Sequence, residues 1–283
     1  MPNIKKLLMD AASLLAASSD SARLDAEILL CLALNKPRSY LRAWPDNEPD
    51  TTQEYVFKCY LQERLLGKPI AYITGYKEFW SRDFKVTPEV LIPRPETELI
   101  IELCLDLIPK NNKTRILDLG TGSGIIGITL AAECPNCEVI ASDFSLAALD
   151  IAKFNAQTHQ TTNISFYQSD WLTDIPNQTF ELIVSNPPYI AKDDVHLIQG
   201  DLRFEPSSAL SANKNGLSDI KTIINNARKY LNPEGYLLIE HGYNQENAVQ
   251  SIYRDFNFYN INTHKDLSAQ PRVTCGQWLP LIK

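Results

Sequence analysis

The residues best suited to chemistry in this sequence are four consecutive ones, Asn186-Pro187-Pro188-Tyr189, which follow an apolar run. Residues 180–184 are predicted to form a buried strand, so Asn186 should project from its carboxyl end, where open α/β sheets bind ligands. Both prolines lack an N–H and have a fixed φ, so the chain cannot continue the sheet. The Asn186 side-chain oxygen and the Pro187 carbonyl oxygen are therefore expected to be rigid hydrogen-bond acceptors beside an aromatic ring.

Such a pair of acceptors suits an –NH2 group on a planar π system. That group has two hydrogens to donate, and its lone pair is delocalised away from attack. Two fixed oxygens can bind both hydrogens and draw the nitrogen toward a pyramidal, nucleophilic geometry, while Tyr189 packs on the flat face. This is chemistry for alkylating an amide or an exocyclic base nitrogen. Asn-Pro and Pro-Pro are also ordinary turn formers, so the segment alone leaves a structural role open.

A glycine-rich loop provides a second signal. It follows a short predicted strand, opens a predicted helix and consists of Gly120, Thr121, Gly122, Ser123 and Gly124. Glycines there permit a tight turn and let a carboxylate or a phosphate lie against backbone amides. Gly122, Gly124 and Gly127 also satisfy the G-x-G-x-x-G pattern of dinucleotide-binding folds. Asp118 would repel a pyrophosphate but could hold an ammonium group, which favours the methionine end of S-adenosylmethionine.

Two further strand ends carry polar or aromatic residues. Asp143 lies about twenty residues beyond the glycines, where a carboxylate can accept both ribose hydroxyls. It could also cap the helix expected from Leu146 to Ala156, and the two roles are compatible. After the next strand, Asp170-Trp171 could bind the adenine edge and stack on the ring, although Trp171 alone is equally consistent with a core position.

These signals follow the carboxyl ends of successive strands, and in this the chain resembles the class I S-adenosylmethionine-dependent methyltransferases. More narrowly, it resembles the HemK family, the protein-glutamine N5-methyltransferases that modify the Gly-Gly-Gln glutamine of peptide chain release factors. The motifs that carry the resemblance are Gly67-Lys-Pro-Ile-Ala-Tyr-Ile-Thr-Gly75, Leu91-Ile-Pro-Arg-Pro-Glu-Thr-Glu98, Asp118-Leu-Gly-Thr-Gly-Ser-Gly124, Asn186-Pro-Pro-Tyr189, Phe204-Glu-Pro206 and Glu240-His-Gly242.

The resemblance implies a cofactor, a substrate and a set of site residues. S-adenosylmethionine would be the methyl donor and S-adenosylhomocysteine the product, and a release factor would be the protein substrate. The cofactor would contact residues 120–124, Asp143, Trp171 and Asn186, while the substrate glutamine would contact Asn186, Pro187, Pro188 and Tyr189. Residues 91–98 resemble the release-factor branch rather than the sister branch that acts on a ribosomal protein. Ala269 stands where the family commonly has glycine, which puts the local turn in doubt.

The element pattern predicts a fold and three segments. Residues 1–75 are expected to form a helical recognition domain, 76–92 a β-hairpin linker and 93–283 the catalytic domain. The catalytic domain should be a Rossmann-like seven-stranded, mainly parallel sheet with helices on both faces. A capping box beginning at Thr51 is expected to open one helix of the first domain. Arg94 and Thr97 either face the site or merely start the helix that follows them.

Composition sets the outer limits. The chain has 283 residues, of which 44% are hydrophobic and 22% charged, enough for one large domain and a small one. The net charge of −7 argues against a broad nucleic-acid footprint. No stretch has the length of a membrane span, and we expect a cytoplasmic, monomeric protein without a metal. Cys31, Cys59 and Cys104 are expected in helical cores, and Cys134 with Cys137 form a lone C-x2-C pair.

Three alternatives remain open on the sequence. An adenine-N6 DNA methyltransferase can use the same Asn-Pro-Pro-Tyr chemistry, but the acidic charge and the lack of an obvious basic DNA-recognition domain oppose it. A binding module without activity would leave the aligned signals unexplained. An NAD-dependent oxidoreductase is disfavoured by Asp118.

Overall fold

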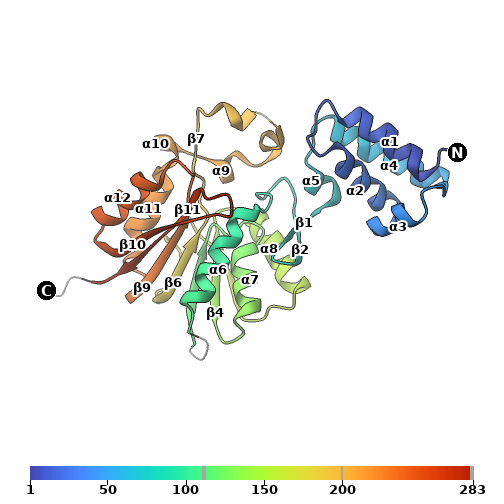
Figure 1. The fold of residues 1–283 in the computed structure, drawn as a ribbon. Coiled ribbons are helices and arrows are strands. Elements are labelled where there is room, and N and C mark those ends of the chain that lie inside the picture. Colours follow the sequence, from blue (N-terminus) through green and yellow to red (C-terminus); the bar gives the residue numbers. More distant parts are fainter. Residues whose placement is uncertain (110–112, 199, 281–283) are drawn as a thin grey trace. The chain divides into compact units, whose positions relative to one another are not determined.

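The computed structural model describes residues 1–109, 113–198 and 200–280 (Figure 1). The chain forms two compact units. The first consists of Met1–Tyr76 together with the segment Ile198–Phe204, and the second holds Lys77–Leu197 and the chain from Glu205 onward.

The first unit is built from helices. They are α1 (Ile4–Leu15), α2 (Ala22–Leu34), α3 (Arg38–Ala43), α4 (Thr51–Leu65) and α5 (Ile70–Thr74). Its core contains Leu15, Leu29, Leu30 and Phe57, all of them nearly inaccessible to solvent. These apolar side chains recur at helical spacing, so one face of each long helix is buried while the other remains polar.

Two expectations for these helices are wrong in detail. The capping box of α4 begins one residue earlier than predicted: the Asp50 side chain accepts a hydrogen bond from the Gln53 backbone, and the Gln53 side chain accepts one from the Asp50 backbone. Asp50 has the extended backbone that an N-cap requires, whereas Thr51 is already helical. Cys59 was expected in a core but is exposed, while Cys31 is half-buried and Cys104 is buried.

A β-hairpin follows, made of β1 (Tyr76–Phe79) and β2 (Arg82–Lys85). Its turn residues, Trp80 and Ser81, both have positive φ, as tight hairpin turns require. The strands occupy less of the chain than the predicted 76–92, because residues 86–92 form no regular element. Asn155 ties the hairpin to the glycine-rich loop, since its side chain bonds both backbone groups of Lys85 and donates to the Ser123 carbonyl at 2.8 Å.

The second unit is organised around a seven-stranded sheet (Figure 1). The strand order is β10-β11-β9-β6-β3-β4-β5, and β11 pairs antiparallel with both β10 and β9, while the other neighbouring strands pair in parallel. The strands are β3 (Arg115–Leu119), β4 (Glu138–Asp143), β5 (Ile164–Gln168), β6 (Phe180–Ser185), β9 (Leu231–Glu240), β10 (Phe258–Lys265) and β11 (Pro271–Trp278). The predicted Rossmann-like, mainly parallel seven-stranded sheet is confirmed.

Helices cover both faces of this sheet (Figure 1). The long ones are α6 (Glu98–Leu107), α7 (Ile125–Glu133), α8 (Leu146–Thr158), α11 (Ser218–Ala227) and α12 (Glu246–Asp255). Side chains alternate along β6 from Leu182 onward, so Leu182 and Val184 pack with α6 and α7, while Ile183 packs with α11 and α12. Phe180 lies on the same face as Ile183, because the strand has a register irregularity between Phe180 and Leu182. A strand buried on both faces reads as a continuous apolar run, which is why residues 180–184 are so hydrophobic.

Short elements connect β6 with α11. They are β7 (Ile190–Ala191), two 3-10 turns (Val195–Ile198 and Gly200–Phe204), α9 (Ser207–Leu210), β8 (Ser211–Ala212) and α10 (Asn213–Gly216). β7 and β8 pair in parallel as a small separate sheet.

The turn at Ala269 forms despite the missing glycine. Ala269 has a φ of 60°, which a side chain tolerates poorly. Asp266 holds the turn instead, because its carboxylate accepts hydrogen bonds from the backbone of Ser268 and of Gln270, each at 2.9 Å. No helix in the described part of the chain is long and apolar enough to cross a bilayer.

Candidate active site

Strand register brings the predicted motifs to one edge of the sheet. Leu119, at the end of β3, pairs with Ser142 of β4 on one side and with Ser185 of β6 on the other. The residues that follow Leu119, Ser142 and Ser185 therefore lie side by side at the same edge of the sheet. This places the start of the glycine-rich loop between Asp143 and Asn186, at the point where the strand order reverses direction.

A cavity of about 320 Å³ opens at this edge of the sheet. Most of the predicted site residues line it, namely Gly120, Thr121, Gly122, Ser123, Asp143, Trp171, Asn186 and Pro188. Arg94 and Thr97 also line it, so the two residues whose orientation was left open both face the cavity. The predicted residues that do not reach its wall in the described structure are Gly124, Pro187 and Tyr189.

The glycine-rich loop takes a conformation that most residues avoid. Gly120, Gly122 and Gly124 all have positive φ. A Cβ on Gly124 would lie 2.4 Å from the Cδ1 of Ile128, whereas a Cβ on Gly122 would meet nothing within 4 Å. Gly124 is thus required for the start of α7, and Gly122 keeps a stretch of backbone bare beside the cavity.

Asp118 supports this loop from beneath. Its Oδ2 accepts hydrogen bonds from the Thr121 hydroxyl at 2.6 Å and from the Gly127 backbone at 2.9 Å. The side chain is fully buried, and this burial raises the pKa of the Asp118 carboxyl to about 7. Its other oxygen, Oδ1, has no hydrogen-bond partner among the described residues. Asp118 is therefore a structural support of the loop with one acceptor left over.

Asp143 faces the cavity and braces the same loop. Its carboxylate accepts from the backbone N–H of Gly122 and of Ser145, each at 2.9 Å. Burial raises the pKa of this carboxyl above its ordinary value. The alternative that Asp143 caps the following helix is wrong, because Ser145 is the N-cap and accepts from the Ala148 backbone. Asp143 thus stands two residues before the cap, as the strand's last residue.

Trp171 combines the two roles that the sequence left open. It lines the cavity and also packs against the hydrophobic core on the α11 and α12 face. Its ring lies so close to Gly120 that a Cβ there would be 3.3 Å from Cζ3. Its backbone has a φ of 50°, an unusual conformation for a large side chain. Such strain is concentrated at functional sites, where the surrounding structure holds it.

The loop from Asn186 to Tyr189 is held by side chains from distant segments. The Asn186 amide nitrogen donates to the Thr97 hydroxyl at 3.1 Å, which leaves the side-chain oxygen as an acceptor. The Tyr189 hydroxyl donates to Glu240 Oε1 at 3.5 Å, and the Tyr189 carbonyl accepts from Gln245 at 3.0 Å. The ring of Tyr189 packs against the core, and burial raises the pKa of its hydroxyl well above the usual range.

Gly216 allows the backbone of this loop to sit where it does. A Cβ on Gly216 would lie 1.9 Å from the Tyr189 carbonyl oxygen. The glycine also has a φ of 80°. Any larger residue would therefore push the loop out of place.

The sequence showed the Phe204-Glu-Pro206 motif without revealing what it does. Glu205 is buried, and its carboxylate accepts from the Arg94 guanidinium and from the Ile92 backbone. The pair joins two stretches more than a hundred residues apart at the cavity wall. The sequence offered one signal, an acidic residue between an aromatic residue and a proline, but that signal did not predict which residues Glu205 would bond.

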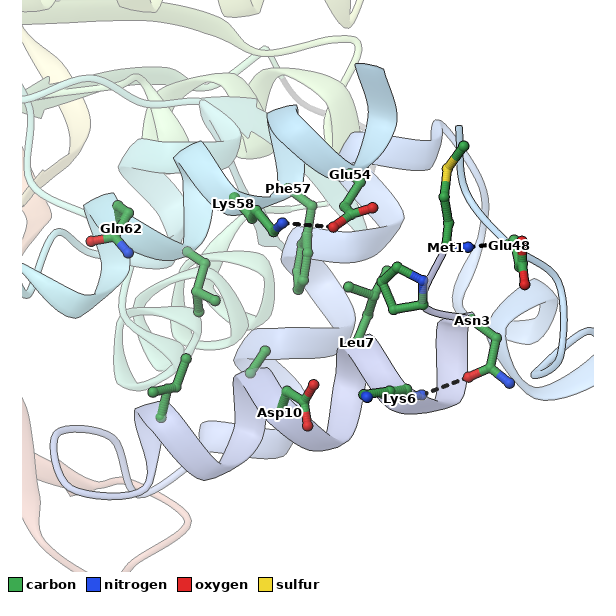
Figure 2. A pocket seen from close by; sticks show the side chains of 14 residues that line it. Met1, Asn3, Lys6, Leu7, Asp10, Glu48, Glu54, Phe57, Lys58 and Gln62 are labelled. Carbon is green, nitrogen blue, oxygen red and sulfur yellow. Dashed lines mark hydrogen bonds and ion pairs between the residues drawn. The ribbon is translucent and has the colours of Figure 1, made fainter. Parts of the chain in front are cut away.

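A second hollow lies in the helical unit, between α1 and α4, with a volume of about 810 Å³ (Figure 2). Leu7 and Phe57 lie at its centre, and Glu54 pairs with Lys58 at its side at 2.6 Å. Around it, the amino terminus of Met1 pairs with Glu48, and the Lys6 backbone donates to the Asn3 side chain. The described residues hold no cluster of His, Cys, Asp and Glu that could bind a metal ion.

Comparisons with known proteins decide the family. A family model described as a methyltransferase domain matches residues 110–280, and the PrmC N-terminal domain model matches residues 6–75. The release factor glutamine methyltransferase of Aliivibrio fischeri is 44% identical over 268 residues, 94% of each chain. The enzyme of the same name from Coxiella burnetii is 44% identical over 273 residues, covering 96% of this chain and 98% of that one. This chain belongs to the release factor glutamine methyltransferase family.

Family membership confirms the resemblance drawn from the motifs. A solved methyltransferase from Pyrococcus furiosus has the same fold, with a TM-score of 0.54 and 17% identity over 77% of this chain and 98% of that one. The two chains therefore share a fold, and the cavity lies at the edge where open α/β sheets bind their ligands.

Proposed function

We propose that the protein transfers a methyl group from S-adenosylmethionine to the side-chain amide nitrogen, N5, of the glutamine in the Gly-Gly-Gln motif of a peptide chain release factor. S-adenosylhomocysteine is the other product. The observation that carries the proposal is that the glycine-rich loop and the Asn186 loop line one cavity in a chain of this family. A cofactor and an amide nitrogen can therefore be bound side by side.

The cavity wall fits S-adenosylmethionine. The bare backbone at Gly122 and its neighbours accommodates the methionine carboxylate. Asp118 Oδ1, buried and without a partner in the described chain, is proposed as an acceptor for the amino group, although Asp118 does not line the cavity. Asp143 is placed to accept the ribose hydroxyls and Trp171 to stack on the adenine. When bound, the sulfonium supplies an activated methyl group, so the protein has only to position the two reactants and polarise the substrate amide.

The substrate amide is bound by the Asn186 loop. Asn186 Oδ1, at the cavity wall, accepts one hydrogen of the glutamine –NH2, and Pro188 shapes the wall beside it. The Pro187 carbonyl is proposed to accept the other hydrogen, although Pro187 does not line the cavity in the described structure. This contact favours a pyramidal nitrogen whose lone pair can attack the methyl carbon. Tyr189 fixes the far end of the loop through its bonds to Glu240 and Gln245, and its ring packs against the core. No step requires a strong base, because the proton can leave after the nitrogen has been alkylated.

The helical residues 1–75 are proposed to recognise the release factor. Residues 76–92 are proposed to link this domain to residues 93–283, which catalyse the methyl transfer. The hollow between α1 and α4 supports a binding role for the first segment, because its floor is apolar and its rim is charged (Figure 2). The protein is proposed to act as a monomer in the cytoplasm, without direct contact to nucleic acid, in keeping with its net charge of −7.

Labelled S-adenosylmethionine tests the proposal in one assay. The protein is incubated separately with a release factor, with the same factor carrying alanine in place of the Gly-Gly-Gln glutamine, and with adenine-containing DNA. We expect label in the intact release factor and none in the other two. Label in DNA instead would support the adenine-N6 alternative, and label in the alanine-containing factor would place the methyl group elsewhere.

A further inference from the structure

One buried asparagine joins the β-hairpin to the glycine-rich loop. Asn155, on α8, is 1% exposed. Its Nδ2 donates to the Ser123 carbonyl at 2.8 Å and to the Lys85 carbonyl at 3.1 Å, while its Oδ1 accepts from the Lys85 backbone N–H at 2.8 Å. Both hydrogens of the carboxamide and one lone pair of its oxygen are therefore used. Three segments of the catalytic unit meet at this side chain.

Lys85 fixes the direction in which the Asn155 carboxamide points. A backbone N–H can only donate and a carbonyl can only accept, so the two groups of Lys85 distinguish the oxygen of the carboxamide from its nitrogen. The nitrogen is left with a second hydrogen, which it donates to Ser123. A reversed carboxamide would place its oxygen against two carbonyls and its nitrogen against an N–H. The glycine-rich loop thus bonds a side chain whose orientation is set by the hairpin.

The Ser123 carbonyl belongs to the last peptide of the loop before α7 begins. Ser123 lines the cavity, and Gly124 is the N-cap of α7. The N–H of the same peptide, on Gly124, donates to the Thr121 carbonyl at 2.8 Å, so the peptide is held at both of its polar groups. Gly122 and Gly124 have positive φ, and glycines leave a free backbone many conformations, so such a loop needs anchors to keep one of them.

The hairpin is held against α8 at further points. His159 Nε2 donates to the Asp83 carbonyl at 3.0 Å, and the His159 ring lies 4.9 Å from the ring of Phe84. The Nζ of Lys85 lies 4.3 Å from the centre of the Phe154 ring. Phe84 is 0% exposed and belongs to the hydrophobic core on the α6 and α7 face. The hairpin is therefore part of the packed catalytic unit as well as a connection between two segments of the chain.

We propose that Asn155 is a positioning residue that couples the β1-β2 hairpin to the cofactor-binding loop, so that an ordered hairpin and a bound S-adenosylmethionine stabilise each other. The inference rests on the proposed function, because it requires that the glycine-rich loop bind the cofactor. Lys85 is not among the described residues that line the cavity, so the hairpin acts through Asn155 and Ser123. Coupling between two sites is reciprocal: what the hairpin adds to cofactor affinity, the cofactor adds to the order of the hairpin.

Removing the carboxamide tests the inference. Asn155→Leu keeps the size of the side chain and removes all three bonds. We expect the Kd for S-adenosylhomocysteine, measured by calorimetry, to rise about 10-fold or more, because buried backbone groups lose their partners and the loop loses an anchor. The KM for S-adenosylmethionine should rise in parallel, while kcat at saturating cofactor should fall less than about 3-fold, because bound cofactor orders the loop again. A merely structural role would not separate KM from kcat in this way.

Asn163→Leu is the matched control. The Asn163 side-chain nitrogen also bonds backbone carbonyls of the catalytic unit at 2.9–3.2 Å, namely those of Ala131, Cys134 and Cys137. Asn163 directly precedes β5, so it lies at the amino ends of the parallel strands, away from the cavity edge. Its replacement should lower the free energy of unfolding but leave the Kd for S-adenosylhomocysteine within about 2-fold of the wild-type value, because distant sites act independently. An equal loss of affinity in both variants would overturn the inference.

Hydrogen exchange in the wild type tests the coupling without a variant. S-adenosylhomocysteine should slow the exchange of the Lys85 backbone N–H about 5-fold or more beyond any slowing at Val139, whose N–H bonds the Asn163 carbonyl at 2.9 Å. Equal slowing at both positions would mean that the cofactor stabilises the whole unit evenly. That result, or a wild-type Kd in Asn155→Leu, would overturn the inference. A wild type that does not bind S-adenosylhomocysteine would instead contradict the proposed function.

Discussion

The two walls of the cavity are held in place by different means. On the cofactor wall, the bonds that shape the glycine-rich loop join residues close in sequence: Asp118 to Thr121 across 3 positions and Gly122 to Asp143 across 21. On the substrate wall, Asn186 bonds Thr97 across 89 positions and Tyr189 bonds Glu240 across 51. The glycine-rich loop of the first wall is held mostly by nearby segments, from β3 to α8, whereas the second wall depends on contacts between more distant parts of the sheet. The structural effect of a substitution should therefore stay local on the cofactor wall and reach more distant segments on the substrate wall.

Asn186→Ala should give the largest effect and separate the walls most cleanly. It removes an acceptor for the substrate amide, and losing one such contact costs about 10²–10³ in rate. The affinity for S-adenosylhomocysteine, measured by calorimetry, should stay within about an order of magnitude, because the cofactor wall is intact. Unchanged turnover would remove Asn186 from the mechanism.

Gly216→Ala tests whether the substrate wall is disturbed by a substitution in another segment of the chain. The added methyl would lie 1.9 Å from the Tyr189 carbonyl oxygen. We expect a loss of about 3 kcal/mol or more in unfolding free energy, as for severe overpacking, and a marked loss of turnover. Gly75→Ala is the matched control, because Gly75 has a similar φ of 78° but nothing within 4 Å of its Cβ. That variant should lose about 1 kcal/mol, from backbone strain alone, in urea unfolding.

The pH dependence of stability should reveal the acid behind the substrate wall. The pKa of Glu240 is raised from 4.5 to about 7 in the folded protein, so the folded chain holds this proton more tightly than the unfolded chain. Its contribution to stability is thus full below about pH 4.5 and is lost as pH rises to about 7, on the order of 3 kcal/mol. Urea unfolding at pH 5 and pH 7.5 should show a smaller decline in Glu240→Gln than in the wild type. Parallel declines would mean that Glu240 titrates normally.

Asp143→Ala tests the cofactor wall rather than the substrate wall. Removing a charged acceptor of ribose hydroxyls should weaken S-adenosylhomocysteine binding about 10- to 100-fold by calorimetry. The rate at saturating cofactor should fall much less, because the substrate wall is untouched. Asp150→Ala, whose side chain is 76% exposed on α8, is the control and should bind as the wild type does. If Asp143→Ala bound S-adenosylhomocysteine normally but turned over slowly, the assignment of Asp143 to the cofactor wall would be contradicted.

The same contrast explains how far the sequence could be interpreted. The strand ends, the glycine-rich loop and Asn186 follow from periodicity and local chemistry, so the sheet and most of the cavity wall were predictable. The partners of Asn186 and Tyr189 were not, because they depend on which strands become neighbours. Caps were misplaced by a residue or two, at Asp50 and Ser145, since a cap depends on the backbone angles of a single residue.

Glu205 and Glu240 show a further limit. Glu240, at the end of an apolar run, looks like the place where a strand reaches solvent, and Glu205, before a proline, looks like part of an exposed turn. Both are instead buried, and each bonds a residue on another segment. Burial of a charge is decided by tertiary partners, which sequence spacing does not contain.

The path of the chain has a practical consequence. Residues Ile198–Phe204 belong with the helices, where Asp201 pairs with Arg64 at 3.0 Å and Arg203 donates to the Leu66 carbonyl at 3.1 Å. The polypeptide therefore passes between the two units three times, near residues 76, 197 and 204. A truncation after Tyr76 would not yield two self-sufficient pieces. Each piece would lack bonding partners that the other retains, so the helices and the catalytic sheet are best studied within one intact polypeptide.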